Sequence, residues 1–315
     1  MKGVFGNTKA SVSAQRLVWD SLDRDGSAAA LCSSNPGGFD LVIASDCLFF
    51  KASRQNTLSE RSERPEGSER PDRRMEAVYE RLSERLRVTV RERRGRSEAA
   101  RTGSGSGGGS GGGDGVEEGR GEQLWVAVAG APGSGKTTLA AEVCRLVQAE
   151  FPAVCVPMDG YHLYRRELDA MPNPAEARRR RGSHWTFDGA RFLREVGEAR
   201  RRGRGSFPGF DHAVGDPVEN FWTVKPSHAV VIVEGNYLLL KGVEPWDGAS
   251  ALFDETWAIR CPSEVCAERV RKRHVETGIE DGEARARVEG NDFPNAVLVE
   301  ERCPWHEVDV VVDSV

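Results

Sequence analysis

Eight consecutive residues carry the clearest chemistry of the sequence, and they read Gly130-Ala131-Pro132-Gly133-Ser134-Gly135-Lys136-Thr137. They fit the pattern G-x-x-x-x-G-K-[ST], in which glycines let backbone N–H groups converge on phosphate oxygens. We expect Lys136 to reach the β- and γ-phosphates of a nucleoside triphosphate and the Thr137 hydroxyl to ligate Mg²⁺. With Thr138, these residues form the predicted nucleotide-binding segment.

The residues on either side of this motif predict the elements that position it. Leu124–Ala129 is a short apolar run typical of a buried strand, and Thr138–Val147 has apolar residues at helical spacing. The motif therefore sits at a strand-to-helix turn, where the helix N-terminus adds a positive dipole end. A glycine-rich turn with an unrelated lysine is the alternative, and this context disfavours it.

Two acids follow predicted strands directly. Asp159 comes after Val154–Met158, and its carboxylate can accept a hydroxyl proton or hold Mg²⁺ through water. Because Asp-Gly is turn-like, a turn or a cap is the alternative role. Glu234 ends the apolar run Ala229–Val233. Burying such an acid is costly unless Mg²⁺ or Lys136 meets it, so we predict a Walker-B-like role in preference to a structural one.

The rest of the pattern predicts an α/β fold with a parallel sheet flanked by helices. Further strands are expected at Glu255–Arg260 and Val308–Val312, and helices at about 188–202 and 263–276. Continuous apolar strands separated by helices indicate a sheet that is covered on both faces. Ligands of such sheets bind beyond the carboxyl ends of the strands, where both acids lie.

The segment between the two acids is the expected acceptor site. Ser183–Asp188 and Phe207–His212 each set aromatic residues beside an acid, which suits a polyol or a sugar-like substrate. Core packing of the aromatic residues, with Asp188 as a helix cap, is the alternative. The candidate substrate-binding residues are Tyr161, His162, Trp185, Asp188, Asp211 and His212.

Three arginine-rich stretches need an explanation. In Glu264–His274 the guanidinium groups of Arg269 and Arg273 suit the charge on a transferring phosphoryl group, although a basic helix end also pairs favourably with the helix dipole. We expect His274 to lie on the surface. The runs Arg178–Arg181 and Arg200–Arg204 are most simply solvated faces; the alternative is that they bind a phosphorylated or acidic substrate.

Five motifs occur in order within residues 123–313: GAPGSGKT, PMDGYHL, FDHAVGDP, VVIVEGNYLLL and RVRKRH. Together they resemble the phosphoribulokinase/uridine kinase/pantothenate kinase family, in particular its nucleoside/nucleotide kinase-like or fructose-kinase-like branch. The resemblance implies a three-layer P-loop NTPase fold, ATP and Mg²⁺ as cofactors, and transfer of the γ-phosphate to a hydroxyl of a sugar, a nucleoside or a pantothenate-like molecule.

The same resemblance implies roles for particular residues. Asp159 would be the general base, Glu234 would lie on the Mg²⁺ side with Thr137, and Arg269 and Arg273 would be lid arginines that hold phosphates. The segment Asn291–Asn295 resembles a family segment near the nucleotide.

The chain before residue 123 is expected to contribute little. Residues 1–51 resemble the middle of calmodulin-lysine methyltransferase-like proteins, through Gly6–Lys9, Trp19-Asp20 and a strand at Phe39–Asp46. The cofactor loop of that family would lie before Gly6, so a truncated α/β fragment is expected. Residues 52–122 are predicted to be a charged and Gly/Ser-rich, disordered linker with an amphipathic helix at about 74–91, followed by the kinase domain at 123–315.

Composition limits the remaining function classes. A net charge of −5 disfavours a dedicated nucleic-acid binder, and seven cysteines without a C-x-x-C pair favour a reducing compartment over a zinc site. Without a run of 18 apolar residues no membrane contact is expected. We therefore expect a cytoplasmic enzyme, with a weak transit-peptide signal in residues 1–19, and a homodimer is left open.

The main alternative function is a P-loop NTPase or a nucleotide-binding regulatory module that has no phosphoryl acceptor. The sequence lacks an N-K-x-D guanine-reading motif and an ABC-type signature, and residues 160–228 suggest an acceptor pocket. A methyltransferase carried by residues 1–51 is disfavoured because its glycine loop is missing.

Overall fold

The computed structural model describes residues 39–44, 47–52, 71–103, 123–211 and 213–314. The chain divides into two compact units, Met1–Glu66 and Gly67–Val315. In the first unit, β1 (Phe39–Ala44) and β2 (Cys47–Ala52) form an antiparallel pair. The strand predicted at Phe39–Asp46 is present as β1, whereas Gly6–Lys9 and Trp19-Asp20 lie outside the described residues.

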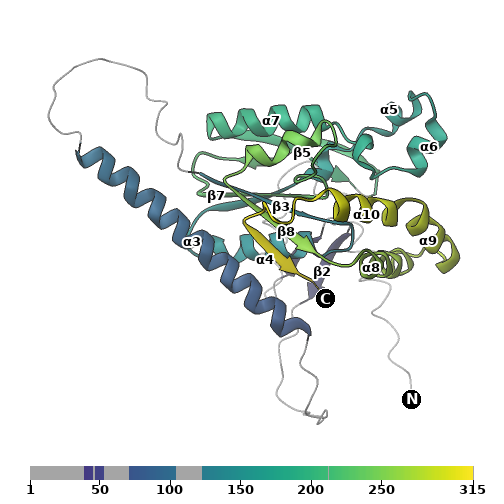
Figure 1. Cartoon of the computed structure of the whole chain (residues 1–315), viewed down its shortest axis with the longest axis horizontal. Coiled ribbons are helices and arrows are strands. Elements are labelled where there is room, and N and C mark those ends of the chain that lie inside the picture. Colours follow the sequence, from purple (N-terminus) through teal and green to yellow (C-terminus); the bar gives the residue numbers. More distant parts are fainter. Residues whose placement is uncertain (1–38, 45–46, 53–70, 104–122, 212, 315) are drawn as a thin grey trace, which may run out of the picture. The chain divides into compact units, whose positions relative to one another are not determined.

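The second unit is built on a parallel sheet of five strands in the order β4-β7-β3-β8-β9 (Figure 1). The strands are β3 (Leu124–Gly130), β4 (Ala153–Pro157), β7 (Val230–Gly235), β8 (Glu255–Arg260) and β9 (Val310–Asp313). Every neighbouring pair is parallel, which confirms the predicted sheet.

The central strand β3 shows why helices cover both faces. Trp125, Ala127 and Ala129 belong to one core cluster, and the alternate residues Leu124, Val126 and Val128 belong to the other. Side chains of α7 (Gly189–Arg202) and α10 (Phe293–Arg302) complete the first core, and those of α3 (Pro71–Gly103) and α4 (Lys136–Gln148) complete the second. Figure 1 shows α7 and α4 on opposite sides of the sheet. The three-layer α/β fold is therefore confirmed.

Helix α3 extends well beyond the 74–91 segment predicted from the sequence. Leu82, Leu86 and Val90 are each at most 2% exposed and pack in the core formed with β3 and α4. Arg85 pairs with Glu255 of β8, and Arg91 Nη2 lies 2.6 Å from Glu150 Oε2. The helix is thus a built-in part of the unit that carries the P-loop motif.

The chain between β4 and β7 forms an insertion. It contains the 3₁₀ turn η1 (Met158–Tyr161), α5 (Arg165–Asp169), α6 (Pro174–Arg179), η2 (His184–Thr186), α7, β5 (Gly205–Asp211) and β6 (Asp216–Val224). The strands β5 and β6 pair antiparallel as a separate two-stranded sheet. The sequence analysis did not predict this hairpin.

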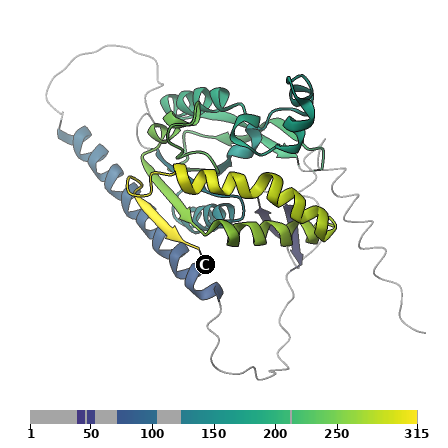
Figure 2. The same ribbon diagram turned by 45° about the vertical axis from the view of Figure 1, so that its right-hand side comes forward.

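The chain after β7 supplies the last elements. The 3₁₀ segment η3 (Trp246–Leu252) precedes β8, and α8 (Ser263–Glu276), α9 (Asp281–Arg287) and the π-helix η4 (Val288–Asp292) follow it. Figure 2 shows α10 alongside α8 before the chain reaches β9. Among the helices of the described residues, none combines the length and apolar character that a membrane crossing requires.

Candidate active site

Strand register brings the P-loop and both predicted acids to one edge of the sheet. Glu234 of β7 is level with Val128 of β3 on one side and with Pro157 of β4 on the other. The P-loop begins at Gly130, two residues after Val128, and Asp159 lies two residues after Pro157. Since parallel strands end at the same edge, the three groups are neighbours there.

The P-loop has the backbone that an anion site needs. Gly133 and Gly135 have φ angles of 82° and 92°, a left-handed region that side chains disfavour. Gly135 is the N-cap residue of the 13-residue helix α4, and no side chain of the described residues caps that end. Lys136 is only 9% exposed. An open helix N-terminus beside a buried lysine fits the phosphate chain of a nucleotide.

The hydroxyl of Ser134 supports this fit. Its Oγ is buried and has no hydrogen-bond partner among the described residues. A Cβ at Gly130 would lie 2.5 Å from that Oγ, so the loop closes tightly around it. A buried hydroxyl that lacks a partner is costly, and a phosphate oxygen would satisfy it.

Two glycines let the turn that carries Asp159 pack closely against neighbouring strands. A Cβ at Gly235 would lie 2.5 Å from the Cβ of Met158, and a Cβ at Gly160 would overlap the carbonyl oxygen of Pro208. The turn that carries Asp159 therefore lies directly against the end of β7 and against β5. Glu234 is 1% exposed, whereas Asp159 is half-buried.

The described residues place no three His, Cys, Asp or Glu side chains together as a metal-binding group. A magnesium ion, however, is usually held by one or two carboxylates together with substrate phosphates. Thr137, Asp159 and Glu234 at this edge match that chemistry.

Helix α8 packs on the P-loop and carries the predicted lid arginines. A Cβ at Gly133 would lie 2.5 Å from the carbonyl oxygen of Cys266. Arg269 Nη1 donates to Gly133 O at 3.4 Å and to Ser314 Oγ at 3.0 Å. Arg273 is half-buried one turn further along the helix. The structure thus brings Arg269 to the phosphate-binding loop itself.

His274 is not the surface residue that the sequence suggested. Its side chain is 13% exposed, and its Nε2 lies 3.2 Å from Asp292 Oδ2. Asp292 ends the π-helix η4, a type of element that is often found at functional sites. The pair joins residues 18 positions apart, so local sequence could not reveal it.

A polar network joins the acceptor-side loop to the C-terminal helices. Ser183 Oγ donates to Asn295 Oδ1 at 3.0 Å, and Asn291 Nδ2 donates to Arg181 O at 2.7 Å. Tyr237 OH donates to Gly182 O at 2.5 Å. The loop at 181–183 is therefore fixed between the end of β7 and the segment Asn291–Asn295, which the sequence analysis had placed near the nucleotide.

Electrostatics show which charges surround Tyr237. Burial raises the pKa of its hydroxyl, the carboxylates of Asp159 and Asp292 raise that pKa further, and Arg180 opposes them. The side chain of Asn236 also lowers that pKa. The sequence analysis did not select Asp292 or Tyr237. The only signals for them were the resemblance of Asn291–Asn295 to a family segment and the position of Tyr237 after Glu234.

Several predicted substrate residues have structural partners. Tyr161 is buried, and its hydroxyl donates to Glu195 Oε2 at 2.8 Å. Asp188 Oδ1 accepts from Arg191 N at 2.9 Å and caps α7, as the alternative interpretation had it. Asp211 Oδ1 accepts from Ala213 N at 2.8 Å in the hairpin turn.

The other predicted substrate residues are more open. The imidazole of His162 contacts the rings of Phe187 and Phe210, at centroid distances of 3.9 and 4.7 Å. Trp185 is 38% exposed. His212 lies outside the described residues.

The arginine runs are only partly solvated faces. Arg178 is 50% exposed and pairs with Asp169, as expected of a surface residue. Arg181 is 19% exposed, donates to Leu163 O at 2.9 Å and also bonds Gly215 O in the β5–β6 turn. Arg200 pairs with Asp254. The prediction of a solvated face is therefore wrong for Arg181, which joins two parts of the insertion, and for Arg200, which connects α7 to residues before β8.

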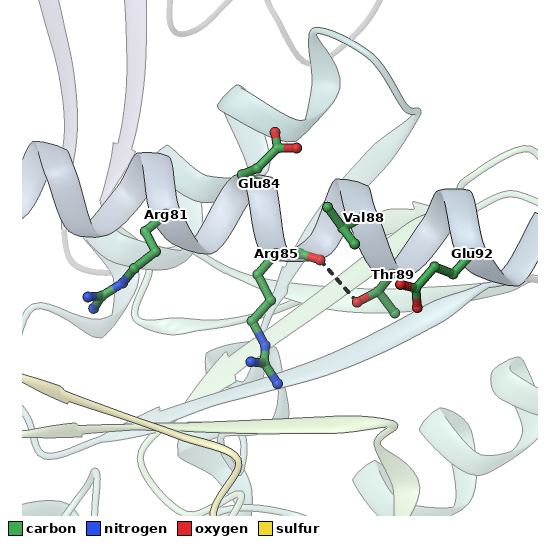
Figure 3. A pocket seen from close by; sticks show the side chains of 6 residues that line it. All are labelled: Arg81, Glu84, Arg85, Val88, Thr89 and Glu92. Carbon is green, nitrogen blue, oxygen red and sulfur yellow. Dashed lines mark hydrogen bonds between the residues drawn. The ribbon is translucent and has the colours of Figure 1, made fainter.

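A hollow beside α3 is not part of this site. Figure 3 shows its lining side chains, which all belong to one helix: Arg81, Glu84, Arg85, Val88, Thr89 and Glu92. Thr89 Oγ1 donates to the carbonyl oxygen of Arg85 at 3.0 Å, and the Arg85 guanidinium pairs with Glu255. The Thr89 hydroxyl and the Arg85 guanidinium are thus used within the protein.

Comparisons with known proteins agree with this geometry. No protein-family model matches the chain. ATP-dependent kinase-like protein notR' of Aspergillus versicolor is 44% identical over 159 residues, which cover 48% of this chain and 92% of that protein. A Schizosaccharomyces pombe protein, named provisionally as uridine kinase C227.14, is 38% identical over 190 residues, covering 57% and 79% respectively.

A solved structure extends the comparison to the fold. It is the structure of a Silicibacter protein, named provisionally as a fructose transport system kinase. It is 34% identical, has a TM-score of 0.55, and the match covers 61% of this chain and 90% of that one. These matches do not support the methyltransferase resemblance of residues 1–51.

Proposed function

This chain belongs to the P-loop kinase family, and on that premise we propose that it transfers the γ-phosphate of ATP to a hydroxyl group of a small molecule. One observation carries the proposal. The adjacent strands β3, β7 and β4 place the P-loop, Glu234 and Asp159 side by side at one edge of the sheet. That edge is where ligands of such sheets bind.

In this proposal each residue has a role that its position supports. The N–H groups of Gly130–Thr138 and the Lys136 ammonium bind the phosphates, and Arg269 reaches the same loop. Asp159 accepts the proton of the attacking hydroxyl. Thr137 and Glu234 would hold Mg²⁺, which neutralises phosphate charge when it is bound. Arg273, one turn further along α8, would be the second arginine that holds phosphates.

The acceptor would bind on the insertion side of Asp159. His162 is two residues from the turn that carries Asp159, and Trp185 offers an exposed indole. An aromatic surface beside hydrogen-bonding groups suits a sugar, a nucleoside or a pantothenate-like molecule. Tyr161, Asp188 and Asp211 would support this pocket through the hydrogen bonds described above.

The test is acceptor-dependent formation of ADP by the full chain with Mg·ATP, across sugars, nucleosides and pantothenate. The expected result is that at least one compound raises turnover well above the rate without acceptor, and that Lys136→Ala abolishes the increase. ATP binding with slow hydrolysis that no compound accelerates would instead favour an NTPase without an acceptor. Absence of ATP binding would refute both functions.

A further inference from the structure

Four consecutive arginines end α6 and enter the loop toward η2, and they differ in their partners. Arg178 pairs with Asp169, Arg179 pairs with Glu176, and Arg181 pairs with Asp216. In the part of the chain that the structure describes, no carboxylate forms an ion pair with Arg180. Greater exposure to solvent does not explain why Arg180 lacks an ion pair, because Arg180 is partly buried whereas Arg178 and Arg179 are exposed.

Among the described residues, the guanidinium of Arg180 has one hydrogen-bond partner. Its Nη1 donates to the carbonyl oxygen of Gly290 at 3.0 Å, and no other hydrogen bond joins this guanidinium to the described residues. A guanidinium has five N–H donors, and a neutral carbonyl leaves its charge uncompensated. Holding such a group partly out of water is costly unless an anion meets it.

The position of Arg180 is on the acceptor side of the candidate active site. Two residues further on, Gly182 O accepts the hydrogen bond from Tyr237 OH at 2.5 Å. The charge of Arg180 lowers the pKa of that hydroxyl, whereas the carboxylates of Asp159 and Asp292 raise it, so the cation and the proposed base act on the same tyrosine. The Gly290 carbonyl and the network of Asn291 hold the loop in this position.

We propose that Arg180 binds an anionic group, a carboxylate or a phosphate monoester, carried by the phosphoryl acceptor. The proposal rests on the proposed function and narrows its substrate class to a hydroxy acid or a phosphorylated alcohol. A planar guanidinium suits both groups, because either can accept two parallel hydrogen bonds. A neutral polyol would leave the cation unmatched.

Matched acceptor pairs test this proposal on the full chain. The pairs are D-gluconate and D-glucose, pantothenate and pantothenol, ribose 5-phosphate and ribose, and uridine 5'-monophosphate and uridine. For the pair that is turned over, the anionic member should have the higher kcat/KM by about tenfold or more, which is typical of a charge-assisted hydrogen bond. The first two pairs report a carboxylate, and the last two report a phosphate.

Variants assign the preference to Arg180. Arg180→Ala should raise the KM of the anionic acceptor about 10- to 100-fold, leave the KM of ATP unchanged and remove the preference. Arg180→Lys keeps the charge without the fork and should lie between the two. Arg178→Ala removes an exposed arginine of the same run and should behave as wild type.

The possible outcomes distinguish failure of the anionic-acceptor proposal from failure of the proposed function. Equal use of both members of a pair, or a preference that survives in a folded Arg180→Ala protein, would overturn the anionic-acceptor proposal alone. If Arg180→Ala lowered kcat and ATP affinity equally with both members of a pair, the anionic-acceptor proposal would also be overturned, and Arg180 would be assigned to the transferred phosphate. Failure of every compound to raise ADP formation would overturn the proposed function, and this proposal with it.

Discussion

Replacing Gly235 with alanine puts a methyl group where the structure has no room for one. The new Cβ would lie 2.5 Å from Met158 Cβ and 2.8 Å from Met158 Sδ. Carbon atoms in contact normally lie about 3.5–4.0 Å apart, so the two segments must separate by about 1 Å. Met158 is buried and directly precedes Asp159, so the displacement moves the proposed base relative to the P-loop.

The size of this displacement gives the expected loss of rate and of stability. A shift of about 1 Å in a positioned reacting group costs about 100-fold in rate, and overpacking a core costs about 1–3 kcal/mol of stability. We expect Gly235→Ala to lower kcat for phosphoryl transfer about 100-fold, with ATP affinity within a few-fold of wild type because the P-loop is unchanged. Steady-state kinetics, ATP titration and urea unfolding measure the three quantities.

Gly248→Ala is the matched control. A Cβ at Gly248 has no heavy atom within 4 Å, so this variant should keep the wild-type rate and stability. If Gly235→Ala were as active as Gly248→Ala, the close contact between β7 and the turn at Met158–Tyr161 would not position Asp159. The reasoning about the site would then be refuted.

Three further predictions concern the fold and its titrating groups. Leu86→Ala in α3 should lower the free energy of unfolding by about 2–5 kcal/mol in urea titrations. Val88→Ala changes an exposed side chain of the same helix and should have little effect. Equal effects of the two substitutions would contradict the packing of α3. Burial lowers the pKa of His184 and His228 in the folded protein. As the pH falls below about 6.5, the unfolded chain therefore binds more protons than the folded protein does, and the free energy of unfolding should decrease. Urea unfolding at pH 5.5 and 7.5 should show a smaller loss for His184→Gln than for wild type, and an equal loss would oppose this assignment. Burial raises the pKa of the thiols of Cys144, Cys266 and Cys303 to about 12. Iodoacetamide at pH 8 should therefore leave these three thiols unmodified in the native protein and modify them in urea, and peptide mass mapping measures the difference.

Sequence patterns predicted the elements whose bounds depend on their own residues. The predicted strand Glu255–Arg260 and helix 263–276 match β8 and α8 in both bounds, because an apolar run ends at Arg260 and Pro262 precedes the helix. The P-loop motif likewise lies between β3 and α4 as its flanking residues indicated. Asp188, predicted as a substrate-binding residue, caps α7, as the alternative interpretation had it.

Other features depend on contacts between distant segments. The hairpin of β5 and β6 contains Pro208 and Gly209, which weaken a strand signal, and Arg165 and Arg181 hold its turn from another part of the insertion. The burial of His274 needs Asp292 in a π-helix, and the distinct position of Arg180 appears only when the partners of its neighbours are known. Helix α3 continues past its apolar stripe into a charged segment where Arg96 faces Glu92, so its end could not be read from hydrophobic spacing.

The central claim is that Asp159 activates an acceptor hydroxyl beside the P-loop. The most direct measurement compares wild type and Asp159→Asn in acceptor-dependent ADP formation, with ATP affinity measured on the same proteins. The account predicts that Asp159→Asn binds ATP as wild type does and transfers phosphate about 100- to 10,000-fold more slowly, as expected when a general base is removed. Wild-type turnover by a folded Asp159→Asn protein would contradict it.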